Sequence, residues 1–142
     1  MKTKILLLAL TFSTSIMCAQ KLAEKEVPVP VLGGFKMKYK DVKVEKWEKE
    51  GANFEAEFDL NKQEYSVLLD AAGNILETEV EIPVSELPLG VKEYVTKNYK
   101  GSKIKEASKI TDASGMVTYE AEVAKEDLIF DANGIYLKTQ KP

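Results

Sequence analysis

Asp70-Ala71-Ala72-Gly73-Asn74 and Asp131-Ala132-Asn133-Gly134-Ile135 are two similar stretches from which the fold can be predicted. Each stands between two apolar runs, which is typical of the turn of a β-hairpin. Asp at the first position of such a turn can accept hydrogen bonds from the backbone two residues on, and Gly at the fourth position can take a positive φ. The sequence therefore predicts two hairpins at equivalent places in two halves of the chain.

The segments next to the hairpins alternate apolar and acidic residues. Phe54-Glu-Ala-Glu-Phe58 lies before the first hairpin and Tyr119-Glu-Ala-Glu-Val123 before the second, while residues 76–82 continue the alternation after the first. A period of two predicts strands with one buried face and one face in water. Ahead of these strands, apolar residues recur four positions apart in residues 28–39 and 88–99, which predicts one helix in each half.

The two halves match element by element. The shift between them is 60 residues in the helices, 65 in the acidic strands and 61 at the hairpins, and it changes only at predicted turns, where insertions cost little. We interpret the chain as a tandem duplication of an α-β(4) unit, with repeats at residues 28–83 and 84–142. This predicts an α+β domain: one eight-stranded antiparallel sheet with two helices on one face, preceded by a flexible lead-in at residues 20–27.

Residues 1–19 have the three parts of a secretory signal peptide: a positive start, an apolar centre and a small residue at the end. We expect cleavage between Ala19 and Gln20, and a periplasmic or secreted mature protein. Polar residues interrupt the apolar run, so we expect no membrane insertion of the mature chain. Met17 stands where a lipobox needs a small residue, so lipid anchoring at Cys18 is not expected.

The composition excludes several classes of function. The 20 basic residues are all lysine, with no arginine or histidine, against 23 acidic residues, and cleavage would remove two lysines to leave a net charge of −5. Without His or mature Cys, the chain lacks an imidazole base, a thiol nucleophile and a soft-metal site. Alanines occupy the positions of the Asp-Gly turns where a calcium loop needs acids. We expect no enzyme activity, no cofactor, no metal and no nucleic-acid partner.

Two sets of residues are candidates for binding a partner. The first set is made of strand glutamates on the face opposite the apolar residues: Glu55, Glu57, Glu77, Glu79, Glu120 and Glu122. They form either a solvated sheet face or a binding surface. The second set is Trp47, Tyr65 and Tyr136, whose positions at strand ends are compatible with core packing or with anchoring a partner on the open face.

A family resemblance rests on the leader, the two helix-and-strand units that each end in Asp-x-x-Gly, and the residues between them. Those residues are Leu87, Pro88, Val91, Tyr99, Gly101 and Ile104. In these features the sequence resembles the PepSY-like family of secreted bacterial proteins, which is similar in fold to the β-lactamase-inhibitor protein. The resemblance implies a binding or inhibitory role, so we expect a protein partner in the cell envelope. The alternatives are a small-ligand or ion sensor of the envelope and a purely structural component.

Overall fold

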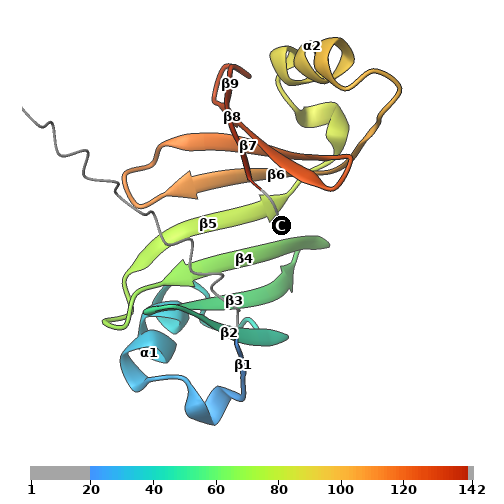
Figure 1. Cartoon of the computed structure of the whole chain (residues 1–142). Coiled ribbons are helices and arrows are strands. Elements are labelled where there is room, and N and C mark those ends of the chain that lie inside the picture. The colour runs from blue at the N-terminus through green and yellow to red at the C-terminus, as the bar shows by residue number, and fades with distance from the viewer. Residues whose placement is uncertain (1–19, 141–142) are drawn as a thin grey trace, which may run out of the picture.

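The strands of the sheet follow one another in chain order, and each pairs antiparallel with the next (Figure 1). The computed structural model describes residues 20–140. Its strands are β1 (Gln20–Leu22), β2 (Lys46–Glu50), β3 (Asn53–Leu60), β4 (Gln63–Leu69), β5 (Ile75–Glu81), β6 (Ile104–Asp112), β7 (Val117–Val123), β8 (Glu126–Asp131) and β9 (Tyr136–Gln140). Its helices are η1 (Glu24–Glu26), α1 (Val29–Lys38), η2 (Val84–Glu86) and α2 (Leu89–Asn98). The α+β class is confirmed, but the sheet has nine strands instead of eight.

The additional strand comes from residues 20–27, which we expected to be a flexible lead-in. They form β1 and η1 instead, and β1 pairs with β2 so that Leu22 lies opposite Trp47. The same arrangement recurs 60 residues later, where the N–H of Ile82, just past β5, donates to the carbonyl of Ala107. The prediction of eight strands was wrong. β5 pairs with β4 of the first half and with β6 of the second, and β1 pairs with β2 as an additional strand in the first half.

Prolines fix the start of both helices. Pro28 and Pro88 stand at the N-cap positions of α1 and α2. A proline fits there because it lacks the N–H that would otherwise have no partner inside the helix. Both helices end before a tyrosine, Tyr39 or Tyr99, whose backbone N–H still donates to the last turn. The two helices predicted from the apolar spacing are confirmed.

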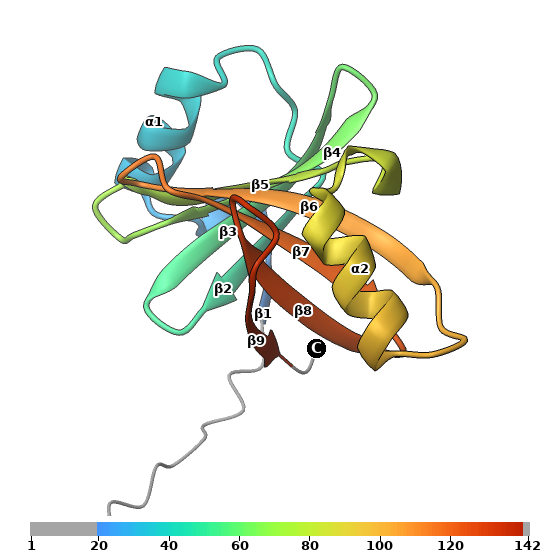
Figure 2. The same cartoon turned by 90° about the horizontal axis from the view of Figure 1, so that it is seen from above.

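Both helices cover the same face of the sheet. Residues paired across antiparallel strands point to the same side. One row of pairs crosses from β3 to β8: Phe58, Tyr65, Val80, Lys109, Tyr119 and Phe130. The first end of this row packs into the core beneath α1 and the last end into the core beneath α2. Figure 2 shows α1 and α2 at different ends of the twisted sheet, and its other face carries no helix.

Each half of the chain has its own hydrophobic core. Beneath α1, the ring of Phe35 contacts Tyr39, Trp47 and Phe58, with ring centroids 5.2 to 5.6 Å apart. Beneath α2 the core is built mostly from aliphatic residues, together with the fully buried Phe130. Burial of these side chains is the main favourable contribution to folding.

The Asp-Gly turns have the predicted geometry. The Oδ1 of Asp70 accepts hydrogen bonds of 2.9 Å from the backbone N–H groups of Ala72 and Asn74, and Gly73 has a φ of +88°. The turn at Asp131 repeats this pattern. The register shifts at the start of each returning strand, which is the bulge that a glycine with positive φ permits.

Each of these turns also contacts the helix of its own half, backbone against backbone. A Cβ atom added at Gly34 of α1 would lie 1.9 Å from the carbonyl oxygen of Gly73. A Cβ added at Gly90 of α2 would lie 2.7 Å from the carbonyl oxygen of Gly134. The glycines therefore allow hairpin and helix to approach more closely than any side chain would permit.

We predict that Gly34→Ala lowers the free energy of unfolding by about 2 kcal/mol, because the methyl group forces the helix away from the hairpin. Gly33→Ala is the matched control. Nothing lies within 4 Å of a Cβ at Gly33, so this change should raise the free energy of unfolding by about 0.5–1 kcal/mol, as expected for Gly to Ala within a helix. Urea denaturation measures both values. Equal effects of the two substitutions would contradict the close contact.

Candidate functional site

Carboxylates collect on the face of the sheet that the helices leave open. Three rows of paired residues cross it: Glu48–Glu55–Leu68–Glu77–Asp112, Glu57–Ser66–Glu79–Ile110–Thr118 and Glu81–Ser108–Glu120–Ile129–Lys138. Glu122, paired with Asp127, shares this face with Glu120 because the two glutamates are two residues apart on β7. The structure therefore brings all six predicted glutamates to one face.

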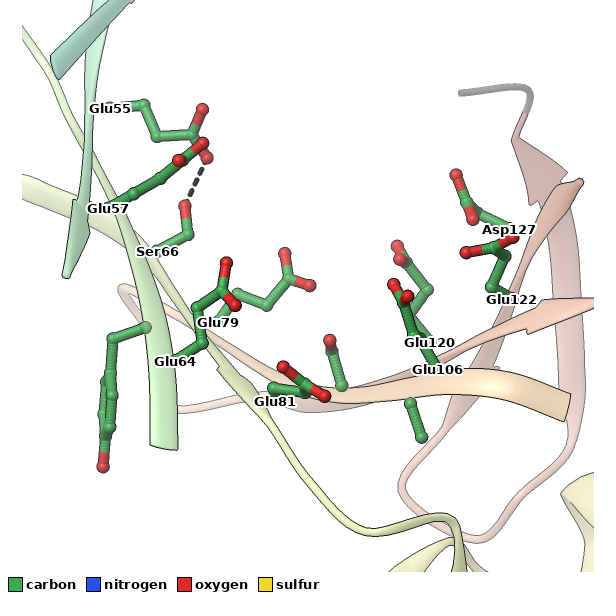
Figure 3. Close-up of a pocket in the computed structure, with 13 residues that line it drawn as sticks. Glu55, Glu57, Glu64, Ser66, Glu79, Glu81, Glu106, Glu120, Glu122 and Asp127 are labelled. Carbon is green, nitrogen blue, oxygen red and sulfur yellow. Dashed lines mark hydrogen bonds between the residues drawn. The ribbon is translucent and has the colours of Figure 1, made fainter. Parts of the chain in front are cut away.

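The open face is hollowed into a pocket of about 270 Å³. Its lining includes nine carboxylates: Glu55, Glu57, Glu64, Glu79, Glu81, Glu106, Glu120, Glu122 and Asp127. We call this set the acidic groove. Figure 3 shows Glu55 and Glu57 on one side of it and Glu120, Glu122 and Asp127 on the other. Among the described residues that line the groove there is no lysine. Lys46 and Lys105, outside the lining, form ion pairs with Glu57 at 3.0 Å and with Glu122 at 3.2 Å, and the other carboxylates of the groove face one another without such a pair among the described residues.

The pKa values of two carboxyl groups in the groove, Glu79 and Glu120, are raised. Partial burial, together with the nearby charges of Glu79 and Asp127, raises the pKa of Glu120 to about 7. Burial also raises the pKa of Glu79, although a hydrogen bond from the Ser108 hydroxyl partly opposes the change. A carboxyl group loses its proton less readily where water is scarce and where other negative charges are near. Near neutral pH, Glu120 is therefore a mixture of charged and protonated forms.

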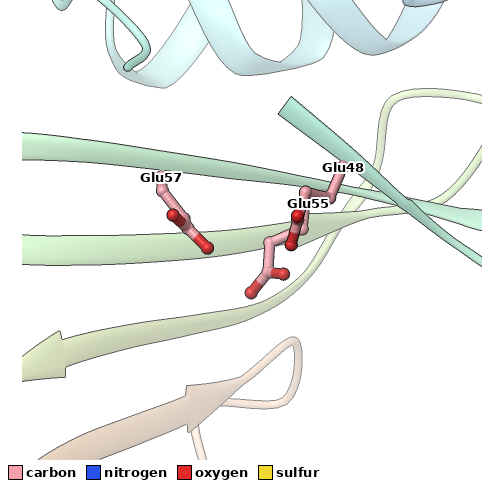
Figure 4. A group of neighbouring side chains, drawn as sticks. All are labelled: Glu48, Glu55 and Glu57. Atoms are coloured by element: carbon pink, nitrogen blue, oxygen red, sulfur yellow. The ribbon is translucent and has the colours of Figure 1, made fainter. Parts of the chain in front are cut away.

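A smaller cluster lies towards β2. Glu48, Glu55 and Glu57 can each place a carboxylate oxygen within 4.8 Å of the other two (Figure 4). The Nζ of Lys46 lies 3.0 Å from an oxygen of Glu48 and 3.0 Å from one of Glu57, and the Ser66 hydroxyl donates to Glu55. The set offers oxygen ligands of the kind that Ca²⁺ prefers, but an ammonium group already neutralises part of its charge.

Trp47 does not lie on the open face, so the structure corrects its place among the candidate anchors. Its side chain is 4% exposed and packs edge-on against Phe35 beneath α1. The physical reason is the register of β2 with both of its neighbours: Leu22 of β1 and Ala56 of β3 lie opposite Trp47, and all three belong to the core side of the sheet. Without β1 in the prediction, the parity of Trp47 could not be fixed.

Tyr65 and Tyr136 are also on the helix side. The ring of Tyr65 stacks on Phe58 with centroids 5.4 Å apart. The ring of Tyr136 stacks on Tyr94 of α2 at 4.5 Å. The rings of both tyrosines thus pack at the edges of the two cores, although Tyr65 also borders the acidic groove.

Two apolar residues lie on the open face that the sequence analysis did not predict there. Ile110 and Ile129 are 9% and 5% exposed, yet they stand in the rows that contain Glu79 and Glu120. A signal for Ile129 was present in the sequence. It is the middle of three consecutive apolar residues, Leu128–Phe130, and in a strand the middle residue must point away from its neighbours.

Comparison with known proteins gives the family. A family model described as "Putative beta-lactamase-inhibitor-like, PepSY-like" matches residues 15–77 and again residues 62–138. The chain belongs to this PepSY-like family. By its description the family is inhibitor-like rather than catalytic. A search of curated proteins found no match.

Solved structures share the fold of this PepSY-like chain. A crystal structure described as a putative periplasmic protein from Bacteroides eggerthii has a TM-score of 0.72 and 16% identity, covering 80% of this chain and 88% of the other. A DUF2874 family protein from Bacteroides uniformis has a TM-score of 0.70 and 16% identity, covering 80% of this chain and 88% of the other. A BLIP-like protein from Bacteroides fragilis has a TM-score of 0.62 and 22% identity, covering 78% of this chain and 83% of the other. At these identities the comparison establishes the fold.

The predicted location of the PepSY-like chain agrees with the description of a solved structure that shares its fold. The periplasmic description of the Bacteroides eggerthii protein agrees with the periplasmic or secreted location predicted from the leader. Within residues 20–140, no helix has the length and apolar character needed to span a membrane. The predicted signal peptide, with Cys18 and Ala19, lies outside the described residues.

We predict that the stability of the PepSY-like protein falls as the pH rises from about 4.5 to about 7. Because the folded-state pKa of Glu120 is about 7, above the ordinary 4.5, the folded state keeps a proton that the unfolded state releases in this window. Glu120→Gln removes that group. The variant should be more stable than the parent by about 1 kcal/mol above neutral pH, allowing for screening by solvent, and the gain should fade towards pH 4.

Urea denaturation across this pH range measures the effect. Glu93→Gln is the control, because Glu93 is exposed on α2 and outside the acidic groove. Its free energy of unfolding should follow that of the parent at every pH. An unchanged pH slope in Glu120→Gln would show that the raised pKa is not coupled to folding.

Proposed function

We propose that this protein is a non-enzymatic periplasmic binding module that recognises a positively charged protein partner through the acidic groove. The observation that carries the proposal is the gathering of nine carboxylates on one hollowed face with no lysine in the described lining. Like charges held together oppose folding. Groups with strongly perturbed pKa values, such as Glu120, are concentrated at functional sites. A basic partner would remove the repulsion and leave the carboxylates paired.

The size of the groove supports a protein segment as the partner. Its lining residues come from β3 through β8, so it crosses about five strand spacings, or about 24 Å. An extended segment of about seven residues spans that distance. Lysine or arginine side chains from such a segment would reach the carboxylates without entering the core. The family description, which is inhibitor-like, agrees with a role in binding a protein.

The proposed binding surface includes the glutamates that were predicted from the sequence but does not use the three predicted aromatic residues as anchors. Glu55, Glu57, Glu79, Glu120 and Glu122 line the acidic groove, while Glu77 lies beside it in the neighbouring strand row. The rings of Trp47, Tyr65 and Tyr136 pack against the cores on the helix side, so truncating them would lower stability and would not test the partner surface separately.

The second candidate function is an ion sensor, favoured by the cluster of Glu48, Glu55 and Glu57. A divalent cation there would have to displace the ammonium group of Lys46 from two carboxylates, each 3.0 Å away. That competition makes the ion sensor the weaker candidate. A small-ligand sensor would use the acidic groove itself and would select a cationic molecule.

The binding proposal is tested with a synthetic peptide of alternating lysine and serine, about eight residues long so that it spans the groove. We expect the mature protein to bind it and the affinity to fall steeply with added salt. Glu79→Gln/Glu120→Gln should weaken binding by about tenfold or more. Isothermal titration calorimetry measures the affinities.

The matched control is Glu86→Gln/Glu93→Gln, which removes the same charge from exposed positions at η2 and α2. A loss that depends only on net charge would be equal in both double variants and would contradict a specific groove. Proteins captured from a periplasmic extract can then be purified and titrated against the same variants.

The ion-sensor candidate makes a separate prediction. If it is correct, Ca²⁺ raises the melting temperature of the protein, because a ligand of the folded state stabilises it, and Glu55→Gln removes the rise. If the protein is a binding module alone, the melting temperature stays constant when Ca²⁺ is added. Differential scanning fluorimetry with Mg²⁺ as the comparison ion distinguishes the two.

A further inference from the structure

An apolar pocket lies beside the acidic groove on the open face. Among residues 20–140, Ile110 and Ile129 are the buried apolar residues that belong to neither of the two cores beneath the helices. Both line a pocket of about 280 Å³. Met116 and Leu137 line it as well, and they are 64% and 53% exposed. We call these four residues the apolar pocket.

The apolar pocket is continuous with the acidic groove through the strand register. Ile110 lies directly opposite Glu79 across β5 and β6. Ile129 lies directly opposite Glu120 across β7 and β8. Residues paired in this way have Cβ atoms about 5 Å apart on the same face. A segment bound along the acidic groove would therefore pass from carboxylates to apolar side chains within one residue.

We propose that the apolar pocket receives a single aliphatic or aromatic side chain of the same partner that occupies the acidic groove. The partner would then carry an apolar residue directly beside its lysines or arginines. This inference rests on the proposed function and adds to it the composition and direction of the bound segment. Its basic residues lie over the acidic groove on β3 to β8, and its apolar end lies over the part of β6 to β9 where Ile110, Met116 and Leu137 line the apolar pocket.

The volume and the surrounding charge support this occupant. The pocket of about 280 Å³ has room for a side chain, and its two buried isoleucines, Ile110 and Ile129, favour an apolar one. Glu77 and Asp112 border it on the side nearest β5, and Lys138 borders it on β9. Acidic side chains thus continue along the side of the pocket that faces the groove, which favours basic residues next to the apolar one. Exposed apolar side chains around a buried floor are typical of a protein-binding site.

The test uses three synthetic peptides: the lysine–serine peptide, the same peptide with a leucine added at its N-terminal end, and the same peptide with a leucine added at its C-terminal end. We expect leucine at one end to strengthen binding to the mature protein by about tenfold, and leucine at the other end to have a much smaller effect. The gain should be lost in Met116→Gln/Leu137→Gln, which leaves every carboxylate in place. Binding of the plain peptide should be the same in this variant as in the parent.

The matched control is Met37→Gln/Leu89→Gln. These two residues are 90% and 70% exposed on α1 and α2, so the substitutions remove the same side chains from the helix side. The tenfold gain should persist in this control. A gain that is absent, equal at both ends, or retained in Met116→Gln/Leu137→Gln would overturn the inference.

The same titrations separate this inference from the proposed function. If the plain lysine–serine peptide does not bind, the acidic groove is not a site for basic segments and the proposed function fails. If the plain peptide binds but leucine adds nothing, only the apolar pocket is wrong. If only the leucine peptide binds, and Met116→Gln/Leu137→Gln abolishes it, the pocket is supported without the groove.

Discussion

The backbone contact between each Asp-Gly hairpin and the helix of its own half is the constraint on which the structure depends. Gly73 lies against Pro30 and Gly34, and Gly134 lies against Gly90. A helix held this closely to a hairpin must lie over the face towards which the hairpin bends. Both halves make such a contact, although at different helix positions, and both helices cover one face of the sheet.

The open face then decides the chemistry of the molecule. Strand parity places glutamates on it, and the curvature of the sheet turns carboxylates from β3 and β7 towards one another. The raised pKa of Glu120 follows from this crowding and from partial burial, and it represents a stability that the protein loses near neutral pH. The crowded carboxylates of the open face lower the stability of the protein and are not needed for its fold. This loss of stability is the physical argument that the open face binds a partner.

The two halves solve the same packing problem with different side chains. Trp47 on β2 and Ala107 on β6 stand at equivalent positions, 60 residues apart, as do Gly34 on α1 and Tyr94 on α2. Trp47 packs edge-on against Phe35 of α1, whereas Tyr94 of α2 stacks on Tyr136. Trp47, which the sequence offered as a candidate surface anchor, is therefore a core residue of the first half.

By itself the sequence determined the local elements, because each depends on short-range chemistry. Asp70 and Gly73 specify a turn, proline starts a helix, and alternation with a period of two assigns the glutamates to the wet face. Only the tertiary structure decided the role of residues whose environment comes from distant strands. The pairing of β1 with β2 placed Trp47 in the core, and the pairing of β5 with β6 placed Ile110 beside Glu79. Such neighbours are set by register across the sheet, which no short stretch of the chain contains.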